Sequence, residues 1–540
     1  MKTFEGNIVD LVAKKIFAGV VFVEGGEILK IEPNSKSYSD YILPGFIDSH
    51  IHIESSLMPP SEFARAVIPN GTLATVSDCH EIANVLGFEG INYMQNNVKK
   101  SPLKVFFGVP SCVPATQFDS AGANFGVKET EQLLKRDDLT YMGEFMDLDG
   151  VRKDNPDTLK KLALARQYNK PIDGHLPGFK GDFAKKFITL GVSTDHETLT
   201  CDEAVFKIKN GMKVQIRDGS ACKDFENLHS LIPIHYKDLM FCSDDLHPED
   251  IVKGHMKLLV KRAVAFGYDP LKVLQIACLN PVKHYNLPVG LLQKGDAADF
   301  IVVNNLKEFE VQRAVIDGNV VFEEKKVCFK RAIPQIVNNF HIEPISQSDI
   351  QILAKTDRVL TIQLIRNQLV TDKKVVRTKV VNGLASADVD RDILKIVYLN
   401  RYRKSTPKVA FIKGFGFKRG ALAESVSHDS HNIVAVGTND FDLVKAINLV
   451  IEKKGGFAVV DGNKTEVLPL PIAGLMSNLE FEEIVKKQHK LSDFITSLGA
   501  KPKSSFMTLA FMTLLVIPHL KIGEGGLFDV EKNRFVDVFV

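Results

Sequence analysis

Hydrophobic and polar positions follow a regular pattern through the first half of the chain. From Pro44 onward, short apolar runs typical of buried strands alternate with segments such as 156–166, whose leucines recur at helical spacing. The expected strands are 46–52, 74–79, 104–111, 141–147, 171–175, 192–197, 213–220 and 240–245. Strands and helices alternating in this way are typical of a (β/α)8 barrel, so the pattern predicts an α/β fold of that kind.

The segments on either side of the barrel have a different pattern. Residues 1–43 contain short alternating strands with turn residues at Gly25-Gly26, and a turn and strand follow the last barrel helix. We expect residues 1–43 and 286–345 to form one small β-sandwich domain into which the barrel, residues 44–285, is inserted. Residues 346–540, with alternating strands, helices and glycine turns, are expected to form a C-terminal α+β domain.

Composition limits the classes of partner. The 540 residues are 45% hydrophobic, and 68 Lys and Arg residues balance 66 Asp and Glu residues. A net charge of +2 gives no electrostatic reason to expect nucleic acid or an anionic membrane as a partner. No signal peptide or membrane span is evident, and the seven cysteines include no C-x-x-C pair. These features predict a cytoplasmic protein with reduced thiols.

Ligating residues gather at the ends of the expected strands. His50 and His52 are separated by one residue, so on a strand they point to the same side. Alone, such a pair is more often two histidines on a polar face than a metal site. The barrel supplies further candidates at other strand ends, namely Glu144, His175, His196 and Asp244. Four imidazoles and two carboxylates are too many for one tetrahedral ion, but they suit two divalent ions with one bridging carboxylate.

Each candidate also has an ordinary structural role open to it. Glu144 could form a salt bridge, His175 could cap a loop, and His196 could be a buried core histidine. Asp244 could cap the helix expected at Pro248. These explanations would have to place all the residues on one rim by chance, so we favour metal-assisted hydrolysis, with Asp244 moving the proton. Spacing leaves open whether an ester, an amide, a cyclic imide or an amidine-like ring carbon is attacked.

Several motifs support a family resemblance. They are PGFIDSHIHIESS, SDCHEIANVLG, PSCVPA, DGHLPG, TDHE, IRDGSA and CSDD in the barrel, then GFGFKRGALAESVSHDSHNIVAVG and LPLPIAGLMS near the C-terminus. On these motifs the chain resembles the amidohydrolase superfamily and, within it, the bacterial adenine deaminase family. The match runs nearly end to end, and the two C-terminal motifs are more diagnostic than H-x-H. The chain departs from the usual Asp-Pro-His at Cys79.

The resemblance implies hydrolysis of adenine, a small purine base, to hypoxanthine and ammonia at a binuclear centre of Mn²⁺ or Fe²⁺, with Zn²⁺ as another possibility. It places His50 and His52 at one ion and His175 and His196 at the other. Glu144 would bridge the two ions. Asp244 would complete the first site and shuttle the proton. A homo-oligomer, most simply a dimer, is also expected.

Substrate contacts are expected from further residues. Arg217 could donate to a purine acceptor atom, although an ion pair at the strand end is equally open to it. By similarity to other deaminases, Asp245 could bind a ring nitrogen. The remaining candidates are His80 and Glu81 at the end of strand two and His428, Asp429 and His431 in the run 427–432. We expect that run to fold over the barrel mouth, although such a run is more often a loop of turn-forming residues.

Two alternatives to adenine deamination remain at this point. A related binuclear amidohydrolase acting on another heterocycle would keep every ligand and change only the ring contacts. An inactive scaffold would be expected to have lost ligands, and none of the six is missing.

Overall fold

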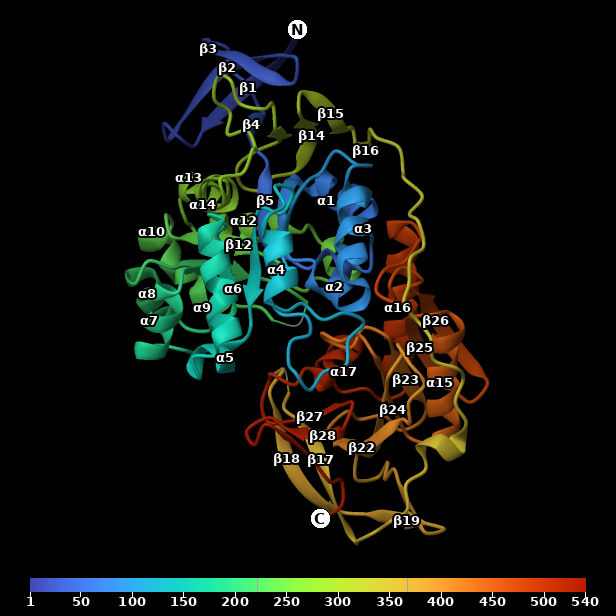
Figure 1. Ribbon diagram of the computed structural model, residues 1–540. Coiled ribbons are helices and arrows are strands. Elements are labelled where there is room, and N and C mark those ends of the chain that lie inside the picture. Colours follow the sequence, from blue (N-terminus) through green and yellow to red (C-terminus); the bar gives the residue numbers. More distant parts are fainter. Residues whose placement is uncertain (221, 367) are drawn as a thin grey trace. The chain divides into compact units, whose positions relative to one another are not determined.

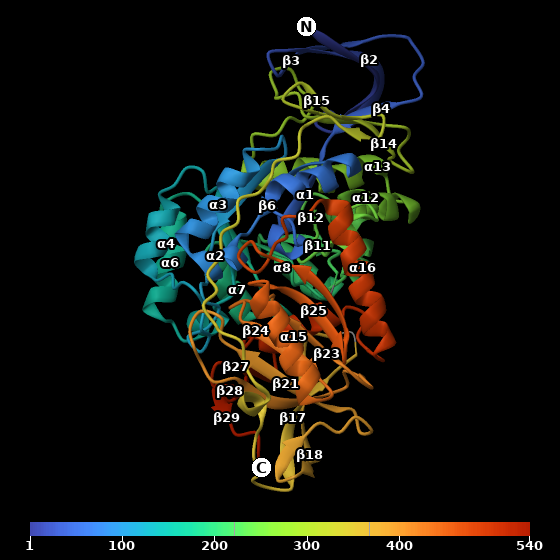
Figure 2. The ribbon, with the colours of Figure 1, turned by 90° about the vertical axis from the view of Figure 1, so that its right-hand side faces the viewer.

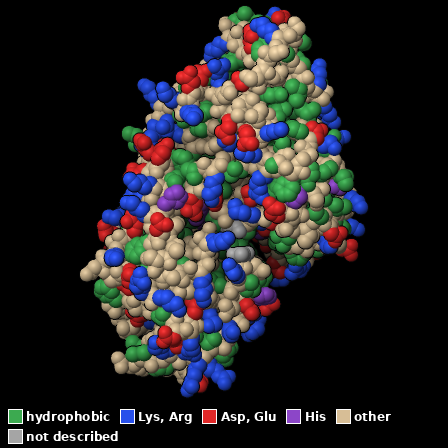
Figure 3. Space-filling model, turned by 180° about the vertical axis from the view of Figure 1, so that it is seen from behind, with side chains coloured by type: hydrophobic (Ala, Val, Ile, Leu, Met, Phe, Trp, Pro, Cys, Tyr) green, Lys and Arg blue, Asp and Glu red, His purple; other side chains and the backbone are tan. Residues whose placement is uncertain are grey.

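The computed structural model describes residues 1–220, 222–366 and 368–540, which form two compact units (Figure 1). The first unit contains Met1–Cys79, Tyr93–Ser111 and Gly126–Pro334. The second contains His80–Asn92, Cys112–Phe125 and Gln335–Val540. Among the described residues, no helix combines the length and apolar character needed to cross a membrane. On the face drawn in Figure 3, basic and acidic side chains are interspersed, as the near balance of charges leads one to expect.

The first unit contains the predicted barrel. Its parallel strands are β5 (Phe46–Ile51), β6 (Thr72–Ser77), β7 (Lys104–Val109), β8 (Tyr141–Phe145), β9 (Ile172–Gly174), β10 (Val192–Asp195), β11 (Lys213–Arg217) and β12 (Leu239–Cys242). They pair in sequence order as one eight-stranded sheet. The sheet closes through a parallel bridge between Ile51 and Asp244, where the Asp244 amide donates to the His50 carbonyl at 2.9 Å. The (β/α)8 fold class is therefore confirmed.

The observed strands end one to three residues before the predicted ends. The sequence pattern of each strand extends into polar residues whose backbone no longer forms the hydrogen bonds of the sheet. For example, Asp244 lies beyond β12 with φ of 58°, in the left-handed region that ordinary residues seldom adopt. The ligating residues therefore lie at and just beyond the strand ends.

Helices surround the barrel strands in Figures 1 and 2. They include α1 (Pro60–Val67), α4 (Val127–Leu134), α6 (Pro156–Gln167), α7 (Asp182–Thr189), α8 (Cys201–Lys209), α12 (Met256–Ala265), α13 (Pro270–Leu274) and α14 (Asn280–Tyr285). The predicted segment 156–166 is α6. It begins at Pro156, after Asn155 accepts hydrogen bonds from two amides of the first turn, and it buries Leu162 and Leu164.

Strands from both sides of the barrel segment form one β domain. The sheet order is β16-β15-β14-β13-β4-β1-β2-β3. These strands are β1 (Lys2–Asp10), β2 (Lys15–Glu24), β3 (Glu27–Pro33), β4 (Tyr41–Pro44), β13 (Phe300–Val303), β14 (Val311–Ile316), β15 (Asn319–Glu323) and β16 (Lys326–Val327). The join is antiparallel, with Phe300 opposite Pro44, and residues of both parts share a core that includes Phe4, Ile42 and Phe300. The barrel is thus inserted in a β domain, as the sequence predicts.

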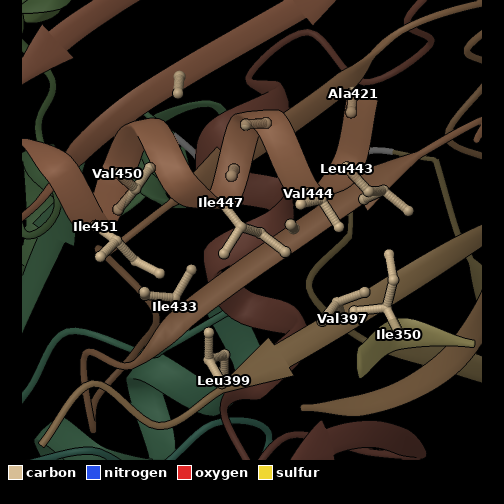
Figure 4. Close-up of a cluster of buried hydrophobic side chains, with 14 of the residues drawn as sticks. Ile350, Val397, Leu399, Ala421, Ile433, Leu443, Val444, Ile447, Val450 and Ile451 are labelled. Atoms are coloured by element: carbon tan, nitrogen blue, oxygen red, sulfur yellow. The ribbon is translucent and has the colours of Figure 1, made fainter. Parts of the chain in front are cut away.

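The second unit is an α+β structure built on a sheet of order β18-β17-β22-β21-β24-β23-β25-β26. Its strands are β17 (Arg358–Leu364), β18 (Thr371–Arg377), β21 (Ile393–Leu399), β22 (Lys408–Lys413), β23 (Ala421–Glu424), β24 (Ile433–Gly437), β25 (Gly456–Asp461) and β26 (Lys464–Pro469). Helix α15 (Asp440–Glu452) packs on this sheet, with Leu443, Ile447 and Val450 at helical spacing facing Ile433 and Leu399 (Figure 4).

Other elements of the second unit complete the fold. They are α2 (His80–Leu86), α16 (Phe481–Ser497), α17 (Ser505–Ala510), the hairpin β19 (Lys379–Val381) and β20 (Leu384–Ser386), and the small sheet of β27 (Leu520–Gly523), β28 (Gly526–Asp529) and β29 (Arg534–Val536). The connection from β23 to β24 is the polar run 425–432, all of it buried.

Candidate metal centre

The six predicted ligands of the barrel gather at the carboxyl ends of its strands. We call this group the barrel centre: His50, His52, Glu144, His175, His196 and Asp244. His50 lies in β5 and Glu144 in β8, whereas the other four follow the ends of β5, β9, β10 and β12. Parallel strands present their carboxyl ends at one rim, which explains why residues far apart in sequence meet here.

Glu144 is the link between the two halves of the barrel centre. Its Oε1 lies 3.1 Å from His52 Nε2, and its Oε2 lies 2.7 Å from His175 Nδ1 and 3.3 Å from His196 Nε2. Asp244 Oδ1 lies 3.3 Å from His52 Nε2 and 3.8 Å from His50 Nε2. One carboxylate oxygen thus faces each half, the arrangement that a bridging ligand needs.

The barrel centre suits divalent metal ions. The ligand atoms of three triplets each lie within 4.8 Å of one another: His50, His52 and Glu144; Glu144, His175 and His196; and His50, His196 and Asp244. His50 is fully buried, yet neither of its ring nitrogens makes a hydrogen bond with a described residue. Burying such an imidazole unsatisfied is costly, and a metal ion is a common partner for neutral imidazole.

Charge at the barrel centre is also right for metal binding. Burial would raise the pKa of Glu144, but hydrogen bonds with His175, His196 and His52 hold that pKa well below its ordinary value. Burial likewise opposes ionisation of Asp244, and its pKa is held well below normal by His52 and by the Arg217 guanidinium. Both carboxyl groups are therefore ionised, the state in which they bind cations.

Neighbouring groups orient the histidines. His52 Nδ1 lies 3.1 Å from the Asp78 carbonyl oxygen, which can only accept a hydrogen bond, and Nε2 faces the two carboxylates. Asp173 lies beside His50, with Oδ2 3.8 Å from its Nδ1. Asp173 itself accepts hydrogen bonds from Thr194 and Tyr285. The hydrogen bond to the Asp78 carbonyl fixes the orientation of the His52 ring, as outer partners do at metal sites.

Arg217 is engaged by carboxylates. Its Nη1 lies 2.8 Å from Asp244 Oδ2, its Nε lies 3.0 Å from Asp224 Oδ2, and its guanidinium also forms a two-pronged contact with Glu197. The ion-pair role named as an alternative is therefore present, and contact with a purine stays a prediction. Asp245 accepts a hydrogen bond from Ser55 at 2.5 Å, and its contact with substrate also stays a prediction.

Glu197 is a residue of the site to which sequence reasoning assigned no role. Its Oε1 lies 3.8 Å from His196 Nε2 and 3.9 Å from His175 Nδ1, besides its contact with Arg217. The signal was available in the sequence, because Glu197 directly follows a strand-end ligand in Thr-Asp-His-Glu. The helix-capping alternative for Asp244 does not apply, because the residue before α11 (Pro248–Ile251) is His247.

The second unit has its own group of ligating side chains, which we call the second cluster: His80, Glu81, His428, Asp429 and His431. All five are at least 96% buried. Glu81 is central, with Oε1 2.9 Å from His428 Nδ1 and 3.6 Å from His80 Nε2, and with Oε2 paired to His431 Nε2. The run 427–432 is thus a buried loop between β23 and β24, and its position over the barrel mouth stays a prediction.

Two family models match the chain. The model of the amidohydrolase family covers residues 41–321, and that of the adenine deaminase C-terminal domain covers residues 368–534. The chain is 47% identical to adenine deaminase of Salinibacter ruber over 99% of this chain and 98% of that protein. It is 46% identical to adenine deaminase of Methanosarcina mazei over the full length of both. The chain belongs to the adenine deaminase family.

The adenine deaminase family match spans both groups of ligating residues. The barrel centre lies within the matched residues 41–321. His428, Asp429 and His431 lie within the region matched by the C-terminal domain of the adenine deaminase family. The resemblance drawn from the motifs is thereby confirmed, and both C-terminal motifs lie within the region that the adenine deaminase C-terminal domain matches.

Proposed function

We propose that the protein hydrolyses adenine to hypoxanthine and ammonia at a binuclear metal centre. The observation that carries this proposal is the end-to-end similarity to curated adenine deaminases, in a chain whose barrel holds ligating residues suited to metal ions. In the reaction, water adds its oxygen to C6 of the purine and the bond from C6 to the amino nitrogen breaks. No oxidant or cosubstrate is needed.

The ligand assignment follows the geometry of the barrel centre. His50 and His52 would hold one ion with Asp244, His175 and His196 would hold the other, and Glu144 would bridge them. Mn²⁺ or Fe²⁺ is proposed, with Zn²⁺ as a further candidate. When bound, such ions lower the pKa of water towards neutrality and so supply hydroxide at working pH.

Asp244 is proposed to move the proton. Its Oδ1 faces the histidines, while Oδ2 is held 2.8 Å from Arg217 Nη1, so the carboxylate is fixed in orientation. Asp244 would accept the proton of the attacking water and return it to the amino nitrogen, which leaves as ammonia. Arg217 would favour the ionised carboxylate that accepts this proton, because it places a cation beside it.

Substrate contacts, domain limits and assembly belong to the same proposal. Asp245 and Arg217 are proposed to bind the purine from the barrel, and the second cluster is proposed to contribute from the loop 427–432.

The proposed domains are residues 1–43 with 286–345, residues 44–285 and residues 346–540. A cytoplasmic homo-oligomer, most simply a dimer, is proposed; all seven cysteines are free thiols. Light scattering on the purified protein would measure the oligomeric state.

Ammonia release tests the function. Protein loaded with Mn²⁺ or Fe²⁺ should release ammonia from adenine and much less from adenosine, guanine or dihydroorotate. Metal analysis must accompany the assay, so that an empty site is not mistaken for a wrong substrate. If fully loaded protein fails on adenine but acts on another heterocycle, the chain has the chemistry of the family with a different ring specificity. If fully loaded protein releases ammonia from none of these compounds, the result favours an inactive scaffold.

A further inference from the structure

The second cluster contains the donor types and the spacing of a cation site. Glu81 pairs closely with His428 and His431, whereas three further approaches between imidazole nitrogens and carboxylate oxygens are longer. His80 Nε2 lies 3.6 Å from Glu81 Oε1 and 3.9 Å from Asp429 Oδ2, and His428 Nδ1 lies 3.7 Å from Asp429 Oδ1. These distances exceed those of good hydrogen bonds.

Metal coordination predicts similar separations. With metal-to-ligand bonds of about 2.1 Å, neighbouring ligand atoms lie roughly 3.0 Å apart in octahedral geometry and about 3.4 Å apart in tetrahedral geometry. Glu81 Oε1 lies 2.9 Å from His428 Nδ1, and the other three separations are only slightly longer than these values. The barrel centre has the same range of spacing between its imidazoles and carboxylates.

An unsatisfied polar atom points to the same conclusion. Asp429 is 4% exposed, and its Oδ2, directed at His80 Nε2, makes no hydrogen bond with any described residue. Leaving a buried carboxylate oxygen without a donor costs free energy, and coordination to a cation would remove that cost.

The side chains of the second cluster are held in place by the second unit itself. The His428 ring stacks on Phe511, with centroids 4.6 Å apart and planes 15° apart, and its carbonyl accepts a hydrogen bond from Thr513 at 3.0 Å. His431 has φ of 51° and donates its amide to the Ser427 carbonyl at 2.6 Å, which closes a tight turn. This turn places the His428 and His431 rings with centroids 5.7 Å apart. Such preorganisation is what a metal site requires.

We propose that the second cluster binds a divalent transition-metal ion additional to those of the barrel centre. The ligand atoms are His80 Nε2, Glu81 Oε1, His428 Nδ1 and a carboxylate oxygen of Asp429. His431 holds the other oxygen of Glu81 and is a positioning residue. Imidazole with carboxylate ligands suits Mn²⁺, Fe²⁺ or Zn²⁺. This role differs from direct contact with adenine, which the sequence predicts for the same side chains.

Metal counting on the full-length protein tests this proposal. The protein is stripped with a chelator, reloaded with Mn²⁺ alone or Zn²⁺ alone, desalted and analysed by plasma mass spectrometry. Glu81→Gln and His428→Asn should each contain one ion per chain fewer than the wild type. His489→Asn, which changes an exposed histidine of α16, should match the wild type. The combined change His50→Asn with His196→Asn, two residues that share a ligand group within the barrel, should deplete the barrel centre and keep the additional ion.

A second measurement needs no variant. Anomalous scattering from crystals of the Mn²⁺-loaded wild type should show a peak bounded by Glu81, His428 and Asp429. The proposal is overturned if that peak is absent, or if the folded cluster variants hold as much metal as His489→Asn. A substrate-contact role alone would raise KM for adenine in these variants and leave the metal content unchanged. Failure of the deaminase assay would not alter the metal count, so the two proposals fail separately.

Discussion

The barrel centre and the second cluster use the same donor types but are built in different ways. The side chains of the barrel centre come from the ends of five different parallel strands, so the ladder of backbone hydrogen bonds sets their positions. Those of the second cluster come from the start of one helix and from one loop between β23 and β24, held by stacking and side-chain bonds. Sites built on strands are held more precisely than sites built on loops, so the second cluster depends more on its own contacts for its shape.

Glu144→Gln should have the largest effect and would break the barrel centre. The amide keeps the size of the side chain but cannot bridge two cations, so one barrel ion should be lost. Turnover of adenine should fall by about 10³-fold or more, because metal activation supplies several kcal/mol of transition-state stabilisation. Steady-state kinetics with metal analysis measures both effects. Glu131→Gln, on the surface of α4, is the matched control. Full activity with one barrel ion would contradict the bridging role.

Arg217→Gln should have the second-largest effect. Removing this guanidinium leaves Asp244, Glu197 and Asp224 without their shared cation in a buried place. We expect a loss of roughly 3–5 kcal/mol in unfolding free energy, as for other broken buried pairs. Urea denaturation measures it. Adenine turnover should fall as well, because Asp244 loses its support.

The control for Arg217 is Arg313→Gln, which breaks a half-exposed pair with Glu323 in the β domain. A surface pair of this kind contributes about 0–1 kcal/mol. Equal destabilisation by the two changes would show that burial does not decide the strength of the Arg217 contacts. In that case the account of how Asp244 is held would need to be replaced.

The sequence predicted much more of the barrel centre than of the second cluster. Strand periodicity predicts that His50, Glu144 and His196 lie on one rim, because a parallel barrel repeats at a nearly constant length. Nothing in that repeat relates Glu81 to His428, whose approach depends on how one loop packs. The pattern of apolar and polar residues locates a strand but does not show where its ladder of backbone hydrogen bonds stops, so the predicted strand ends are too late. For the same reason the pattern assigns no role to Glu197, which lies beyond the observed end of β10.

The double change His428→Ala with His431→Ala tests the contribution of the second cluster to the reaction. We expect adenine turnover to fall by roughly 10–10²-fold in folded protein with a loaded barrel centre, a loss of about 1.4–2.7 kcal/mol in transition-state stabilisation. His489→Ala serves as the control. Unchanged kinetics would remove any role of this loop in the reaction, while the metal count would still report whether the second cluster binds a cation.

The smallest effect on activity should come from Ile447→Ala. This change tests whether the stability of the second unit can be lowered without altering the second cluster. Ile447 is fully buried on α15 against the sheet of the second unit, so its truncation should cost about 2–5 kcal/mol in unfolding free energy. Phe441→Ala changes a residue of the same helix that is 53% exposed and should cost much less. Because Ile447 belongs to the core cluster and holds no ligating atom, turnover and metal content at 25 °C should match the wild type while the protein stays folded. If instead the metal content falls at lower urea concentrations than those that unfold the protein, packing under β23 and β24 sets the geometry of the loop between them. The second cluster would then depend on the core packing of the second unit.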